Sequence, residues 1–136
     1  MLKKRISDIV YEAASAPDKQ MKIAILRKND SPQLRGYLGL TMDKNAVWDL
    51  PEGAPPFKEN KFPDSEIMMY TEFRRMYLFL KGGHPTLKPS KREGLFIGLL
   101  ESLDAKDSKF LIEVVKAKKL PQGLTARAIK EAFFWL

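Results

Sequence analysis

The sequence predicts an all-α domain, a single compact bundle of six to seven helices that contains one long proline-rich loop. Apolar residues recur at intervals of three or four over most of the chain, which is the spacing of an amphipathic helix. Helix start and stop signals separate these stretches. No stretch shows the strict alternation of apolar and polar residues that is typical of strands. With 136 residues, the chain fits one domain, residues 1–136.

The first part of the chain predicts three helices. Apolar residues at helical spacing indicate a first helix that ends before Pro17. A second helix is expected over residues 18–28. Ser31 and Pro32 are typical of an N-cap followed by a proline in the first helical turn, so they begin a third helix.

Residues 43–63 interrupt the helical pattern. The segment contains four prolines and a glycine, which exclude a continuous helix. A loop of this length in a small domain is often functional. Trp48, Leu50 and Phe57 are too apolar to remain wholly in water, so we expect at least one of them to dock on the helices or on a partner.

A long helix is expected to follow this loop. It begins near Asp64 and ends at the Gly82-Gly83 pair, since glycine commonly terminates a helix. Its apolar stripe includes Phe73 and Tyr77.

The remaining residues predict two or three further helices. Ser90 and Glu93 have the spacing of a capping box, which predicts a helix start at Ser90. Residues 110–115 supply another apolar stretch. Thr125 is expected to cap a last helix that runs to Leu136.

The composition argues against catalytic and metal sites. The chain has no cysteine, which excludes disulfides, zinc–thiolate sites and cysteine nucleophiles. Its one histidine, His84, lies in a predicted turn and has no second histidine to join it in a metal site. The sequence also lacks the motifs of nucleotide-binding loops and serine hydrolases. We therefore expect no enzyme, no metal, no cofactor and no small-molecule substrate.

The apolar stretches are too short for a membrane span, which needs ~18 residues. The basic start of the chain is not followed by the apolar core of a signal peptide. The sequence therefore predicts a soluble, cytoplasmic protein without a membrane partner.

Positive charge dominates the sequence and is concentrated near its end. Lys and Arg number 24 against 17 Asp and Glu, a net charge of +7. The segment 114–130 contains five basic residues and no acidic one. Such a basic protein favours an anionic partner, and nucleic acid is one candidate.

Two predicted helix starts combine backbone N–H groups with basic side chains, an arrangement that favours phosphate binding. The alternative for each is ordinary helix capping beside solvated lysines. The DNA-binding interpretation assigns phosphate contacts to residues around both helix starts. Around the start at Ser90 these residues are Lys88, Ser90, Lys91 and Arg92. Around the start at Thr125 they are Lys116, Lys118, Lys119, Gly123, Leu124, Thr125, Arg127 and Lys130.

Two segments resemble the helical N-terminal DNA-binding domain of phage-type ATP-dependent DNA ligases. One is SDIVYEAASAPDKQMKIAILRKNDSPQLRGYLGLTMD near the start, and the other is GLFIGLLESLDAKDSKFLIEVVKAKKLPQGLTARAIKEAFFWL at the end. The resemblance implies a small protein of tailed phages that contacts the phosphates and minor groove of duplex DNA. It places that role on Lys118, Lys119, Gly123, Leu124, Thr125, Arg127 and Lys130. A phage-encoded protein of this kind would act in the host cytoplasm.

The sequence departs from the ligases in ways that exclude their chemistry. It has no K-x-D-G motif, so no lysine is placed to take up AMP, and its end lacks the proline-glycine of the ligase signature. The resulting prediction is a non-catalytic, sequence-independent duplex-DNA-binding protein. The alternative is a protein-interaction module that binds a phage or host protein through the Trp48–Phe57 loop or through Phe134 and Trp135.

Overall fold

The computed structural model describes residues 4–60 and 68–133. Over these residues the chain is helical as predicted, and its only strand-like pairing is an isolated bridge between Trp48 and Leu80. The helical segments follow one another in chain order. They are α1 (Ile6–Ser15), α2 (Lys19–Lys28), α3 (Pro32–Met42), α4 (Met68–Glu72), the 3₁₀ helix η1 (Phe73–Phe79), α5 (Pro89–Ser102), α6 (Ala105–Phe110), the π-helix η2 (Leu111–Lys116) and α7 (Ala126–Ala132).

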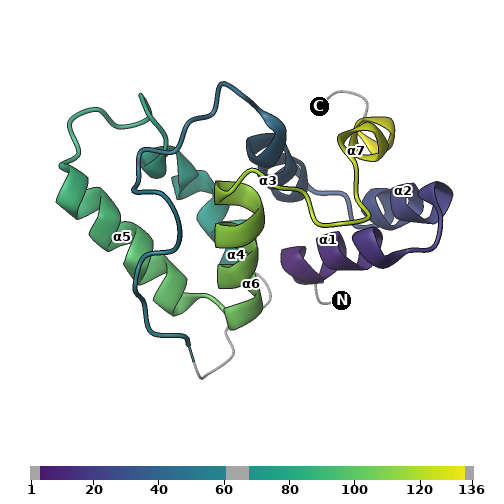
Figure 1. Cartoon of the computed structure of the whole chain (residues 1–136), viewed down its shortest axis with the longest axis horizontal. Coiled ribbons are helices and arrows are strands. Elements are labelled where there is room, and N and C mark those ends of the chain that lie inside the picture. Colours follow the sequence, from purple (N-terminus) through teal and green to yellow (C-terminus); the bar gives the residue numbers. More distant parts are fainter. Residues whose placement is uncertain (1–3, 61–67, 134–136) are drawn as a thin grey trace.

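The helices pack into an elongated body. α1 packs against α2, and α7 returns from the end of the chain to pack against α2 as well. α3 packs against η2, α1 against α6, and α5 against η1. Figure 1 shows α1, α2 and α7 at one end of the long axis and α5 at the other, with α3, α4 and α6 between them. None of the described helices is long and apolar enough to cross a membrane.

Side-chain caps fix most of the predicted helix starts. The Ser31 hydroxyl accepts a hydrogen bond from the Leu34 amide at 3.0 Å, as expected for an N-cap before a proline. The predicted cap at Ser90 is wrong, because α5 begins one residue earlier at Pro89 and its N-cap residue, Lys88, makes no side-chain cap bond. The fixed φ of proline already suits the first helical turn, so no capping hydroxyl is needed there.

The predicted long helix before the glycine pair is two short segments instead. After α4 the chain tightens into η1, in which Phe73, Met76 and Phe79 face the core. This spacing of three residues matches one turn of a 3₁₀ helix, whereas Tyr77, which an α-helix would have placed on the stripe, is 50% exposed. Gly36 makes room for the Phe73 ring, because a Cβ there would lie 2.2 Å from the ring.

The proline-rich loop is docked on the body over its described part, residues 43–60. The Asp49 amide donates to the Phe79 carbonyl at 2.7 Å, which holds the loop beside the end of η1. Trp48, Leu50 and Phe57 are partly buried and pack against the core, so the prediction that at least one of them docks is confirmed. Residues 61–63 of the predicted loop, the expected helix start at Asp64, and residues 134–136 of the expected last helix lie outside the described part of the chain.

A buried ion pair joins the beginning of α1 to α6. The Asp107 carboxylate is fully buried and accepts hydrogen bonds from Arg5 Nη1 at 2.8 Å and from the Ser7 hydroxyl at 2.7 Å. Tyr70 adds a nearby link by donating its hydroxyl to the Lys4 carbonyl at 2.6 Å. Buried charge is tolerated when it is paired and hydrogen-bonded in this way, so this network fixes how the N-terminal helices sit on the middle of the bundle.

Removing one partner of this pair should strongly destabilise the fold. Asp107→Ala removes the nearest carboxylate from the buried Arg5 guanidinium and leaves it the longer contacts to Asp104 at 3.7 Å and Asp8 at 3.9 Å. We therefore expect the free energy of unfolding to fall by about 3 kcal/mol in urea titrations, the lower end of the range for a broken buried pair. The double change Arg5→Met with Asp107→Leu removes both charges and should lose much less. Surface substitutions usually change stability by no more than about 0.5 kcal/mol. If Asp107→Ala falls within that range, the Arg5–Asp107 pair does not stabilise the fold as described.

Candidate nucleic-acid interface

The two predicted phosphate-binding helix starts do not come together. Figure 1 shows α5 at one end of the long axis and α7, with the loop that precedes it, toward the other. The two starts are therefore well separated along the molecule (Figure 1). Each start has to be considered separately.

At the start of α5 the predicted residues divide into exposed and buried ones. Lys88, Ser90 and Lys91 are exposed, but Arg92 is only 3% exposed. Its Nε donates to the Leu78 carbonyl at 2.9 Å, and its Nη2 donates to the carbonyl of His84 at 3.0 Å.

These bonds correct the expectation for Arg92. Its remaining Nη1 lies 3.2 Å from the Asp49 carboxylate, so the guanidinium connects the end of η1, the following turn and the proline-rich loop. A buried guanidinium with these partners cannot reach an external phosphate. Arg92 therefore holds the fold together rather than binding DNA.

Lys116 is also engaged inside the molecule. Its Nζ donates to the carbonyls of Pro51 at 2.8 Å and Gly53 at 2.9 Å, so it anchors the proline-rich loop to the end of η2. Partial burial lowers the pKa of Lys116 from its usual 10.5, and the nearby Glu52 carboxylate opposes that effect. The predicted phosphate contact from Lys116 is therefore replaced by a loop anchor.

Lys118 follows the C-cap residue of η2, and its side chain caps another helix. Its backbone has φ = 57°, a left-handed conformation that glycine usually adopts at a helix end. Its Nζ donates to the carbonyls of Leu40 at 2.9 Å and Asp43 at 2.5 Å, at the C-terminal end of α3. A lysine occupies this strained position because its amine satisfies helix-end carbonyls, so its predicted role at phosphate is also corrected.

The glycine turn before α7 serves packing and capping. Gly123 has φ = 98°, and a Cβ there would lie 2.3 Å from the Ala14 carbonyl oxygen, so only glycine fits against the end of α1. Leu124 is 4% exposed and belongs to the core, which corrects its predicted DNA contact. Thr125 caps α7 by accepting from the Ala128 amide at 3.1 Å, as predicted. The turn therefore has an internal explanation that needs no phosphate.

Two cations of α2 repeat this pattern of carbonyl capping. Lys22 Nζ donates to the Ala14 carbonyl at 2.9 Å at the end of α1. Arg27 donates to the carbonyls of Ala132 at 3.2 Å and Glu131 at 2.8 Å at the end of α7. Cations are favoured at helix C-termini, where unpaired carbonyls carry partial negative charge. Much of the basic character of the chain thus acts inside the fold.

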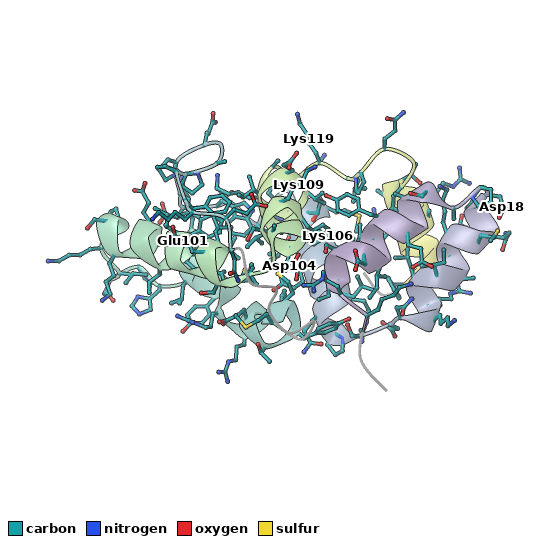
Figure 2. All side chains as sticks on the ribbon, turned by 90° about the horizontal axis from the view of Figure 1, so that it is seen from below. Asp18, Glu101, Asp104, Lys106, Lys109 and Lys119 are labelled. Carbon is teal, nitrogen blue, oxygen red and sulfur yellow. The ribbon has the colours of Figure 1, made fainter. Side chains whose placement is uncertain are left out.

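Lys119, Arg127 and Lys130 are the predicted cations of the second start that remain exposed. Figure 2 shows Lys119 at the edge of the molecule, on the same side as Lys106 and Lys109 of α6. The side chain of Arg127 is 85% exposed and its Nε lies 3.7 Å from the Glu131 carboxylate, a weak surface contact.

The packing of α2 against α7 adds basic residues that the sequence reasoning missed. We define the α2–α7 end as residues 18–28 together with 123–132. It contains six basic side chains and two acidic ones, which is +4 of the chain's net +7. Lys19 and Lys28 are exposed on α2, and Lys19 pairs with Glu131 at 2.6 Å across to α7. The basic pattern of α2 is visible in the sequence, but its proximity to α7 is a long-range contact.

The described residues bring no three His, Asp or Glu side chains together as metal ligands. His84 is half-buried in the turn before α5, where its carbonyl accepts from Arg92. The arrangement thus offers exposed positive charge at one end and internal capping elsewhere.

Two substitutions at Lys118 should distinguish the contribution of its amine to stability from the cost of its left-handed backbone. Lys118→Met keeps the left-handed backbone and loses the bonds to α3, so we expect the free energy of unfolding to fall by about 1.5–3 kcal/mol, the range for hydrogen bonds to charged groups. Lys118→Gly loses the same bonds but relieves a conformation that costs other residues about 1–2 kcal/mol, so it should be the more stable variant. The capping assignment is wrong if urea unfolding shows Lys118→Met unchanged or Lys118→Gly the less stable.

Comparison with known proteins gives one family match. The model of the "Family of unknown function (DUF6433)" matches residues 9–122, which include α2 and stop before Gly123. No curated protein and no solved structure matches the chain significantly. Because the match spans more than half of the sequence, the chain belongs to this family of unknown function, DUF6433.

Proposed function

We propose that the protein is a non-catalytic binder of duplex DNA that contacts the phosphate backbone through its α2–α7 end. The observation that carries this proposal is that four exposed basic side chains lie where two segments distant in sequence pack together, namely Lys19, Lys28, Arg127 and Lys130. Lysine and arginine side chains that neutralise phosphates release counterions, which drives sequence-independent binding.

The exposed face of α7 favours phosphate contacts over base recognition. Its exposed side chains include Arg127, Lys130 and Glu131, and the helix contains no Asn or Gln. Side-chain amides are the usual readers of adenine, and helix residues that read bases line one face in the major groove. We therefore propose binding that does not depend on sequence.

The resemblance to the N-terminal domain of phage-type DNA ligases supports the same proposal. It covers residues 7–43 and 94–136, and it implies a phage-encoded protein that contacts phosphates and the minor groove. The chain lacks the K-x-D-G motif that would accept AMP, so the proposed activity is binding alone. Of the contacts that the resemblance implies, exposed Lys119, Arg127 and Lys130 remain proposed. Lys118, Gly123 and Leu124 are withdrawn, because they have internal roles.

The burial of the loop side chains argues against one of the two surfaces proposed for the alternative, a protein-interaction module. Trp48, Leu50 and Phe57 pack against the core, so they do not form a large exposed apolar patch. Phe134 and Trp135, the other proposed surface, lie outside the described residues. This alternative remains an outcome of the DNA-binding test.

Charge reversal at the two ends of the molecule tests the proposed function. Lys28→Glu with Lys130→Glu, one exposed lysine from each helix of the α2–α7 end, should weaken duplex binding for all sequences alike. If about four or five phosphates are neutralised, the unchanged protein should show a slope of log affinity against log salt of about −4, and this variant a slope shallower by about two. Fluorescence anisotropy of a labelled duplex at several salt concentrations measures both.

Lys88→Glu with Lys91→Glu is the matched control, because it changes the net charge equally at the start of α5. Its affinity should stay close to that of the unchanged protein. Equal losses in both double variants would contradict a site at the α2–α7 end. No measurable duplex binding by the unchanged protein at low salt would refute the function and favour the protein-interaction alternative.

A further inference from the structure

One carboxylate lies between the two helices of the α2–α7 end. Glu131 Oε1 of α7 accepts a hydrogen bond from Lys19 Nζ of α2 at 2.6 Å, and the same oxygen lies 3.7 Å from Arg127 Nε. Two cations that belong to different helices therefore meet at a single anionic oxygen. The other acidic residue of this end, Asp18, accepts from the Met21 amide instead.

The contacts of Glu131 are exposed to solvent. The side chains of Lys19 and Glu131 are 45% and 41% exposed, and that of Arg127 is 85% exposed. Ion pairs with this exposure are screened by water and hold their partners weakly. An anion that approaches from solvent can therefore take the place of the carboxylate without any change in helix packing.

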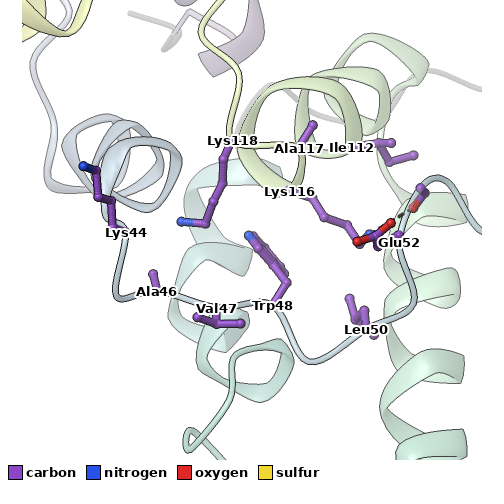
Figure 3. A pocket seen from close by; sticks show the side chains of 11 residues that line it. Lys44, Ala46, Val47, Trp48, Leu50, Glu52, Ile112, Lys116, Ala117 and Lys118 are labelled. Atoms are coloured by element: carbon purple, nitrogen blue, oxygen red, sulfur yellow. Dashed lines mark hydrogen bonds between the residues drawn. The ribbon is translucent and has the colours of Figure 1, made fainter.

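Lys116 and Lys118 are held in a different way. Both donate to backbone carbonyls, and Figure 3 shows their side chains on opposite sides of Trp48. A carbonyl is fixed in the backbone, whereas an exposed glutamate side chain changes rotamer within nanoseconds. Lys19 and Arg127 are therefore paired with a group that can move away, and Lys116 and Lys118 are not.

Glu131 also lies where its own helix does not favour an acidic side chain. It belongs to the last turn of α7 (Ala126–Ala132), and the C-terminal end of a helix carries partial negative charge. Arg127 precedes it by four residues, an order that stabilises a helix less than an acid before a base. The attraction that holds the carboxylate here comes from the cations that it neutralises, of which Lys19 is the nearer.

We propose that Glu131 occupies the place of a DNA phosphate in the free protein, and that binding exchanges this carboxylate for a phosphate between Lys19 and Arg127. The inference rests on the proposed function, because it identifies one phosphate contact of the α2–α7 end. A phosphate oxygen accepts from an ammonium and a guanidinium as a carboxylate oxygen does. Glu131 is thus an autoinhibitory residue, since Lys19 and Arg127 bind phosphate only after they release it.

Glu131→Gln should free both cations and tighten duplex binding. We expect the affinity to rise about fivefold at low salt, because an exposed ion pair no longer opposes the exchange. Fluorescence anisotropy of a labelled duplex measures this change. Misfolding cannot imitate a gain of affinity.

Asp18→Asn is the matched control, because it makes the same charge change at the same end and asparagine preserves the N-cap of α2. It should change the affinity by less than about twofold, since exposed charges that do not contact the site are screened. A double-mutant cycle adds a second control. In a Lys19→Met background, Glu131→Gln should lose most of its effect, because the carboxylate no longer masks that lysine.

The outcomes separate this inference from the proposed function. If the unchanged protein binds duplex DNA and Glu131→Gln binds equally well, or gains no more than Asp18→Asn, the exchange is overturned and the proposed function stands. A full gain from Glu131→Gln in the Lys19→Met background also overturns the exchange. If neither the unchanged protein nor Glu131→Gln binds duplex DNA, the proposed function is refuted and the exchange with it.

Discussion

The ends of short helices are the constraint on which much of this structure depends. Each helix leaves its last four carbonyls without intrahelical partners, and the described helices here have at most 14 residues. Lysine and arginine side chains from other elements satisfy several of these carbonyls. Lys22 reaches the end of α1, Lys118 the end of α3 and Arg27 the end of α7. These contacts are also tertiary links, so helix capping and helix packing are one set of interactions.

Local chemistry was predictable from the sequence, whereas the winding of some segments was not. The Ser31-Pro32 start and the Thr125 cap depend only on neighbouring residues, and both are present. The tightening of η1 depends on where Phe73 meets Gly36, a contact between distant residues. An apolar residue at every third or fourth position is compatible with either helix type. The choice between them is made by packing, which single-sequence periodicity does not contain.

In the candidate site too, the local pattern was predictable from the sequence and the long-range contacts were not. The acid-free segment 114–130 contains Lys119 and Lys130, which are exposed, but it also contains Lys116 and Lys118, whose amines face carbonyls. Lysine and arginine serve both purposes, and their sequence pattern is the same in each case. Lys19 of α2 was missed because its neighbour Glu131 is 112 positions away. Charge segregation in sequence therefore does not separate the lysines that cap helix ends from those that stay exposed.

The central claim is that these basic side chains divide into internal and exposed sets, and lysine-selective NMR of the ammonium groups tests it directly. Ammonium protons that donate to carbonyls should exchange slowly with water, so Lys22, Lys116 and Lys118 should give observable signals when those of Lys119 and Lys130 are broadened by exchange. A short DNA duplex should then shift or sharpen the signals of Lys119 and Lys130 and leave those of Lys116 and Lys118 in place. Uniform exchange across all five lysines, or DNA-induced shifts confined to Lys116 and Lys118, would contradict the account.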